Sequence, residues 1–170
     1  GGDAKASYSS PRYAELCGVR QILNFNAEGL YAHDLADGKV LWSIPWISNP
    51  EERNNVCQSV ILAAAGDQHD RVLVSSGYGM GTSLFDVTME DDEIHLRELW
   101  HSHRLQSKFS SVIVHGEGVF GLDGGILTCL DLGTGRLRWK GGRYGFGQLI
   151  MINDMLLVQC ESGDIALVAT

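Results

Sequence analysis

Hydrophobic residues along the chain alternate with polar ones or run in short blocks, and glycine-containing turns separate these segments. Helical spacing of apolar positions is almost absent. Short apolar segments at regular spacing are typical of an all-β sandwich, barrel or propeller. The chain has 21 glycines and only 3 prolines, which favours many tight turns between short strands.

The clearest unit of four strands lies in the third quarter of the chain. Its predicted strands are 109–114, 119–122, 126–131 and 136–140. Hairpin turns containing glycine separate them. In the last strand Leu137 and Trp139 alternate with basic residues, so we expect these two apolar side chains to share a face.

The same pattern recurs along the whole chain. The predicted units are 8–46, 56–100, 108–140 and an incomplete one, 146–170. Four-stranded repeats of roughly 40–50 residues are the signature of a propeller with one repeat per blade. The sequence therefore predicts an all-β fold. We expect 1–170 to be a single partial β-propeller of about four blades with four antiparallel strands each, the last blade being incomplete.

Two units end in the spacing Asp-x-x-x-Gly-x-x-x-Trp. The residues are Asp34, Gly38 and Trp42, and then Asp131, Gly135 and Trp139. The carboxylate can accept backbone N–H bonds within the turn, and glycine supplies a positive φ. The tryptophan lies on the outermost strand, where it can pack against a neighbouring blade. In the first unit, alternation predicts one face for Val40, Trp42, Ile44 and Trp46.

The second unit is a degenerate copy. Asp86 and Trp100 take the positions of the aspartate and the tryptophan, with a longer connection between them. We expect a turn at 88–92. We also expect His101 and His103 to follow the outer strand.

The stretches AHDLADGKVLW (32–42) and CLDLGTGRLRW (129–139) resemble the tryptophan-docking repeat of the PQQ-like (quinoprotein-type) β-propeller family. The pattern of that repeat is Ala-x-Asp-x-x-Thr-Gly-x-x-x-Trp. Asp37 replaces the threonine in the first copy, and Cys129 replaces the alanine in the second. Family members usually have more blades than this chain supplies, so the resemblance implies a piece of a longer propeller. It also implies a bacterial, extracytoplasmic or periplasmic setting.

The resemblance implies two main classes of function. Quinoprotein dehydrogenases bind pyrroloquinoline quinone (PQQ) and calcium, and carry a vicinal cysteine pair and a catalytic aspartate. Other members are non-enzymatic scaffolds, such as the lipoprotein subunit of the outer-membrane β-barrel assembly machine. The cysteines of this chain are isolated from one another: Cys17, Cys57, Cys129 and Cys160. We expect them to be small buried hydrophobes, although the sequence leaves their disulfide state open.

We therefore expect a non-enzymatic propeller that acts as a protein- or ligand-binding scaffold, with no cofactor and no catalytic residue. The alternative is a fragment of a PQQ-dependent quinoprotein oxidoreductase whose catalytic residues lie outside this segment. Under that alternative alone PQQ is expected. A sensor propeller fused to another domain, such as a kinase, is a third hypothesis.

Charge and hydropathy exclude further classes. A net charge of −8 argues against a nucleic-acid partner, because phosphate attraction needs a basic face. No run of 18 apolar residues exists, so we expect no membrane insertion in this segment. No signal peptide is visible at its start.

The segments that enter each blade carry the candidate binding residues. Basic, hydroxyl and amide side chains recur there: Ser10, Arg53, Ser59, Lys108, Ser111, Arg143 and Gln148. In a propeller these connections lie on one face, at the mouth of the channel. They predict a surface for a protein partner or a small anionic ligand. The alternative is turn chemistry with ordinary surface charge.

Other motifs carry less chemistry. His101 and His103 could share a metal, but no third ligand is apparent, and we predict no metal site. The glycine-rich stretch 77–81 lacks the lysine and helix of a phosphate loop, so we expect a hairpin. The acidic stretch 89–93 lacks EF-hand spacing and is expected to be a hairpin tip.

Overall fold

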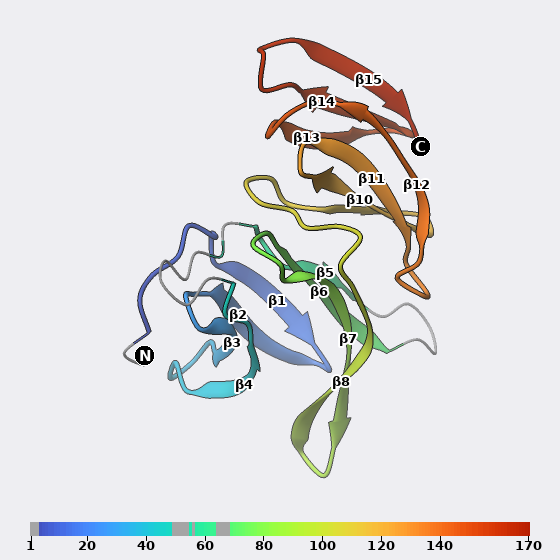
Figure 1. Cartoon of the computed structure of the whole chain (residues 1–170). Coiled ribbons are helices and arrows are strands. Elements are labelled where there is room, and N and C mark those ends of the chain that lie inside the picture. The colour runs from blue at the N-terminus through green and yellow to red at the C-terminus, as the bar shows by residue number, and fades with distance from the viewer. Residues whose placement is uncertain (1–3, 49–54, 56, 64–68) are drawn as a thin grey trace.

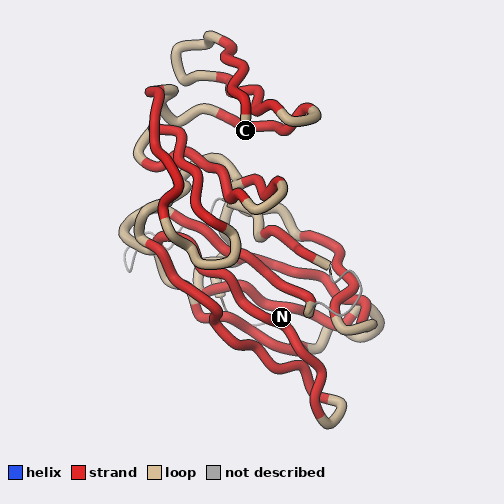
Figure 2. Tube along the Cα trace, turned by 90° about the vertical axis from the view of Figure 1, so that its right-hand side faces the viewer, coloured by secondary structure: helices blue, strands red, loops and turns tan. Residues whose placement is uncertain are grey.

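The computed structural model describes residues 4–48, 55, 57–63 and 69–170. The all-β prediction is confirmed, since the described residues form strands and loops and no helix (Figure 2). Four antiparallel sheets follow one another along the chain as the blades of a propeller, and the last blade has three strands. Within each sheet the strand order is the chain order, so every blade is a simple meander.

The strand bounds divide among the blades as follows. Blade 1 contains β1 (Arg12–Leu16), β2 (Val19–Phe25), β3 (Gly29–Asp34) and β4 (Val40–Pro45). Blade 2 contains β5 (Val60–Leu62), β6 (Asp70–Ser76), β7 (Gly81–Glu90) and β8 (Glu93–Ser102). Blade 3 contains β9 (Ile113–His115), β10 (Gly118–Asp123), β11 (Ile126–Asp131) and β12 (Leu137–Arg143). Blade 4 contains β13 (Gln148–Ile152), β14 (Met155–Gln159) and β15 (Ile165–Ala169).

The blades form an open arc, with blade 1 and blade 4 at opposite ends (Figure 1). Strand alternation gives each blade two apolar faces, and neighbouring blades bury them against each other. Phe25 and Trp42 of blade 1 pack with Val72 of blade 2. Equivalent clusters join blade 2 to blade 3 and blade 3 to blade 4. Among the described residues, no such cluster joins blade 4 back to blade 1.

The outer hairpin of blade 2 is longer than the sequence predicts. Thr88–Glu90 continue β7, and Glu90 pairs with Glu93 of β8. Only Asp91 and Asp92 form the turn, and both have positive φ, 50° and 63°. This is the backbone of a two-residue hairpin whose twist matches that of the strands. The prediction of a five-residue turn was wrong because aspartate tolerates this conformation.

A β-bulge precedes the motif tryptophan in each of the first three blades. Trp42 pairs with Ala32, whereas Val40 pairs with His33, the next residue of β3, so Leu41 is extra. The same shift occurs before Trp100 and before Trp139. Because an extra residue reverses the faces of a strand, Val40 does not share the buried face of Trp42. For the same reason Leu137 and Trp139 lie on opposite faces, contrary to the simple alternation.

The aspartates of the repeated motif make two kinds of contact. In blade 1, Asp34 Oδ1 accepts hydrogen bonds from the amides of Ala36 and Asp37, at 2.7 and 3.2 Å. In blade 3, Asp131 Oδ1 accepts the Thr134 amide at 2.9 Å. Asp86 of blade 2 lies inside the longer β7 and makes side-chain ion pairs instead.

The tryptophan of blade 2 docks on the turn of blade 3. Trp100 Nε1 donates to the Leu132 carbonyl oxygen at 2.8 Å. A Cβ built on Gly135 would lie 2.5 Å from Trp100 Cε3, so the indole ring rests on the bare glycine backbone. Glycine is therefore required at position 135 for two reasons: the backbone has a positive φ of 67°, and the indole ring approaches it closely. This contact fixes the position of blade 2 against the turn of blade 3.

Candidate functional site

The segments that enter neighbouring blades lie side by side and are joined by hydrogen bonds. The Gln58 amide donates to Ser111 Oγ at 3.0 Å, which joins the entries of blades 2 and 3. Gln148 Nε2 donates to the Phe109 carbonyl oxygen at 3.1 Å, which joins the entries of blades 3 and 4. We call the surface formed by these entry segments, together with the loop from Gly77 to Met80, the entry face.

The predicted binding residues differ in how they lie on the entry face. Ser10 is exposed, whereas Ser59 is buried and its carbonyl oxygen accepts a bond from Arg12 at 3.0 Å. The Ser111 hydroxyl is engaged by Gln58. Arg53 lies outside the described residues. Of these three serines, Ser111 is the one whose hydroxyl joins two blade entries.

Arg143 ends β12 and borders a separate shallow hollow. Residues of the last blade, including Glu161 and Asp164, line the other side of that hollow. A carboxylate-rich wall beside a single arginine does not favour an anionic ligand. Arg143 is therefore a weak candidate.

Lys108 lies at the centre of an exposed group of aromatic side chains. Its Nζ lies 4.5 Å from the ring centroid of Tyr78, 5.2 Å from that of Phe109 and 5.5 Å from that of Phe146. The two phenylalanine rings meet edge to face, with centroids 5.4 Å apart. These four residues come from blades 2, 3 and 4, and we call them the aromatic cluster. The rings attract the ammonium group through their quadrupoles.

The three rings of the aromatic cluster are between 39 and 44% exposed, which is unusual for side chains of this size. The loop that presents Tyr78 is braced. The Gly79 amide donates to Gln106 Oε1 at 2.9 Å, and a Cβ on Gly77 would come within 3.0 Å of the Lys108 stem. Tyr78 itself has a φ of 57°, a conformation that costs free energy for a bulky residue.

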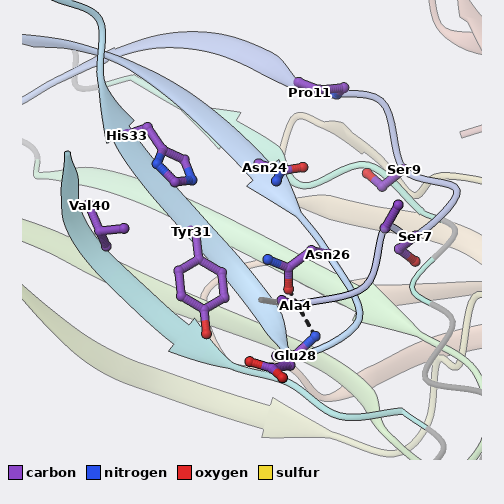
Figure 3. A pocket seen from close by; sticks show the side chains of 11 residues that line it. Ala4, Ser7, Ser9, Pro11, Asn24, Asn26, Glu28, Tyr31, His33 and Val40 are labelled. Carbon is purple, nitrogen blue, oxygen red and sulfur yellow. Dashed lines mark hydrogen bonds between the residues drawn. The ribbon is translucent and has the colours of Figure 1, made fainter. Parts of the chain in front are cut away.

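A second hollow lies on blade 1, on the face turned away from blade 2 (Figure 3). Its volume is about 450 Å³. The His33 and Tyr31 rings stack with centroids 6.5 Å apart. Asn26 Oδ1 accepts the Glu28 amide at 2.9 Å and so shapes the lower rim. The lining mixes amide, hydroxyl, imidazole, phenol and carboxylate groups.

The most buried carboxylate of the three motif aspartates belongs to Asp86. His69 Nδ1 and Arg97 Nη2 each lie 3.0 Å from Asp86 Oδ2, and Arg71 Nε lies 3.6 Å from Oδ1. Burial alone would raise the pKa of Asp86, but the hydrogen bonds from His69 and Arg97 hold it below its usual value. Asp86 on β7 therefore pairs with side chains of the neighbouring strands, Arg71 of β6 and Arg97 of β8, and links the three strands of the blade.

The histidines considered as metal ligands and the four cysteines can now be placed in the fold. His101 lies within β8, contrary to the expectation that it follows the strand, and its Nδ1 lies 2.7 Å from Ser83 Oγ. In the described part of the chain, no group of three His, Cys, Asp or Glu side chains could hold a metal ion. All four cysteines are free thiols; Cys57 and Cys129 are buried as expected, whereas Cys17 and Cys160 are only partly buried. Burial raises the pKa of Cys57 to about 12, so its thiol stays protonated.

Comparison with known proteins identifies the family to which the repeated units belong. A family model described as "Outer membrane protein assembly factor BamB" matches residues 2–141. The chain belongs to this BamB-type, PQQ-like propeller family. Comparison with the curated proteins found no match.

Solved structures similar to this chain have low sequence identity to it. The computationally designed Ika4 protein is 12% identical with a TM-score of 0.62, and the match covers 99% of this chain and 93% of Ika4. A protein of unknown function from Bacteroides caccae is 15% identical with a TM-score of 0.51, over 96% of this chain and 60% of that one. BamB from Moraxella catarrhalis is 16% identical with a TM-score of 0.47, over 96% and 59%. The chain thus spans about three fifths of these two natural proteins. None of its described residues form a helix that is long and apolar enough to cross a bilayer.

The sequence analysis selected Lys108 of the aromatic cluster but missed its three rings, because it considered basic, hydroxyl and amide residues. A signal was present, since Phe109 and Phe146 stand at equivalent entry positions of blades 3 and 4. Tyr78 comes from a hairpin loop of blade 2. Its approach to Lys108 depends on the packing of two blades and has no signal in the repeat.

Proposed function

We propose that this chain is a non-enzymatic, protein-binding propeller and that the aromatic cluster is its binding surface. The observation that carries the proposal is a lysine surrounded by three exposed aromatic rings at the junction of three blades. Aromatic side chains are enriched at the energetically important centres of protein interfaces. Bracing of the Tyr78 loop lowers the ordering cost of binding.

The chemistry of the cluster indicates the kind of partner. Within the described residues Lys108 makes no ion pair with a carboxylate, so its charge is available to an acidic group. The rings offer apolar and edge contacts on either side of the ammonium group. We infer an extended peptide segment with one carboxylate flanked by apolar side chains. The family's description as an outer membrane protein assembly factor supports a scaffold role, and with it an extracytoplasmic setting.

The test is selection from a phage-displayed library of random linear peptides on the intact chain. Selected peptides are then titrated by fluorescence anisotropy against variants. We expect Lys108→Ala to weaken binding about tenfold and the double variant Phe109→Ala/Phe146→Ala to weaken it about thirtyfold or more. Tyr8→Ala is the matched control, because Tyr8 is 75% exposed and lies outside the cluster.

The proposal fails if no peptide is enriched, or if the selected peptides bind the double variant as tightly as the unmodified chain. Circular dichroism of each variant separates lost binding from lost folding. Screening by salt gives a further check: because one ion pair is expected, affinity should fall modestly with ionic strength.

The quinoprotein alternative stays a hypothesis. A vicinal cysteine pair, which the resemblance associates with those enzymes, is not present in this sequence, and Cys57 is buried among backbone carbonyls of Ser107 and Ser110. Under this alternative, the catalytic residues would lie outside this segment. Titration of PQQ with calcium, followed by tryptophan fluorescence, tests the alternative directly.

A further inference from the structure

The three rings of the aromatic cluster enclose the ammonium group of a lysine from the same chain. The Lys108 Nζ lies within 5.5 Å of the ring centroids of Tyr78, Phe109 and Phe146. A cation within about 6 Å of a ring centroid is attracted by the quadrupole of the ring. The three rings therefore form a cation cage, and Lys108 occupies it.

The cage is held by contacts that do not involve the ammonium group. The rings of Phe109 and Phe146 meet edge to face, with centroids 5.4 Å apart. The loop that carries Tyr78 is fastened by the Gly79 amide, which donates to Gln106 Oε1 at 2.9 Å. Because these contacts are made without the lysine, we expect the three rings to keep their places when the lysine side chain is removed.

The stem of Lys108 is also held in position. A Cβ built on Gly77 would lie 3.0 Å from Lys108 Cγ and 3.1 Å from its Cβ, so the stem lies against the glycine backbone. Aromatic cages of this kind are used in proteins to recognise quaternary ammonium ligands. In this chain, a lysine of the chain itself fills the place that such a ligand would take.

We propose that Lys108 determines the specificity of this site by occupying the cage and excluding cationic partners. Its charge repels a second cation, and its side chain fills the space between the rings. Without that side chain, the same rings would bind a quaternary ammonium group. Specific interfaces combine attractive contacts with repulsive elements of this kind. The inference deepens the proposed function and rests on it for the use of the cluster as a binding surface.

The experiment is a proton NMR titration of choline with the intact chain and its variants. Ring currents shift the trimethylammonium protons of choline upfield when these protons lie over aromatic faces. We expect no shift with the unmodified chain and a saturable upfield shift with Lys108→Ala, with a Kd on the order of millimolar. The double variant Lys108→Ala/Phe146→Ala should bind choline about fivefold more weakly, because one of the three rings is gone.

Lys39→Ala is the matched control. It removes one positive charge, as Lys108→Ala does, but the Lys39 side chain is 81% exposed and pairs with Asp37 in the β3–β4 turn. We expect no choline shift with this variant. The control thereby separates an emptied cage from the general attraction of a more acidic chain for a cation.

A second measurement uses the unmodified chain. The ε-methylene protons of Lys108 should resonate upfield of those of the other lysines, and comparison with Lys108→Ala identifies their signal. Ordinary positions for these protons would show that the rings do not enclose the ammonium group, and the proposal would be wrong.

The choline titration has equally definite outcomes. The proposal is overturned if Lys108→Ala with a native circular dichroism spectrum leaves the choline signals unshifted, or if the unmodified chain or Lys39→Ala shifts them equally. None of these results depends on a peptide. If peptide selection fails while choline binds only after Lys108 is removed, the proposed function is wrong and the occupied cage stands. If peptides bind and choline does not, the reverse holds.

Discussion

The turns of blade 1 and blade 3 share one sequence pattern and one backbone, yet they stand in different surroundings. Each has an aspartate that accepts amide bonds and a glycine with positive φ. Only the turn of blade 3 carries a docked tryptophan, Trp100. The motif therefore specifies a hairpin and also a surface on which an indole ring can dock. How much the turn stabilises the fold depends on whether a tryptophan occupies that surface.

The tryptophans differ in a parallel way. Trp100 is 8% exposed and hydrogen-bonded to the next blade. Trp139 is only half-buried, with its ring centroid 6.1 Å from that of Phe120 of its own blade. The interface between blades 2 and 3 thus includes a docked tryptophan, whereas blades 3 and 4 are joined by apolar packing and by side-chain contacts such as the hydrogen bond from Gln148 to Phe109.

The largest expected effect separates these two tryptophans. Trp100→Ala should lower the free energy of unfolding by about 3–5 kcal/mol, because a large buried side chain and its hydrogen bond are lost. Trp139→Ala should cost about half as much, since the ring is only partly removed from water. Urea denaturation followed by circular dichroism measures both. Equal losses would contradict the assignment of docking to one interface.

The next effect separates the two glycines. Gly38→Ala adds only the backbone strain of a positive φ, about 1–2 kcal/mol. Gly135→Ala adds the same strain and also displaces the Trp100 ring, for a further ~1–3 kcal/mol. Urea unfolding midpoints give the difference.

A double-variant cycle sharpens this comparison. In the Trp100→Ala background the cost of Gly135→Ala should fall to that of Gly38→Ala, because the clash partner is gone. If Gly135→Ala stays as costly without the indole, the ring does not rest on the glycine.

The difference between the two turns also marks what the sequence could predict. The spacing of Asp131, Gly135 and Trp139 suffices for the hairpin, because aspartate and glycine act within the turn itself. It does not reveal the bulge at Arg138, since an extra residue in a strand is specified by pairing with the neighbour. The three rings around Lys108 were not predicted for a similar reason. Phe109 and Phe146 stand at repeat positions, but the contact of Tyr78 with Lys108 exists only after blades pack.

The smallest effect compares the motif aspartates of blades 2 and 3 through pH. The pKa of Asp131 is lowered by its bonds from Arg138 and Thr134, and that of Asp86 is also below its usual value despite burial. Carboxyl groups with lowered pKa stabilise the fold above the ordinary aspartate value near 3.8, and this stability is lost as pH falls through the folded pKa.

The unfolding free energy should therefore decline below about pH 4, and Asp86→Asn should flatten this decline more than Asp131→Asn. This difference is expected because the Asp86 carboxylate is shielded from solvent within β7, whereas solvent screens the more exposed ion pair of Asp131. Urea titrations from pH 7 down to about pH 2.5, bracketing the ordinary aspartate pKa, follow the slope. A steeper acid slope in Asp86→Asn than in the unmodified chain would mean that this carboxyl is protonated in the fold. The hydrogen bonds from His69 and Arg97 would then not hold its charge.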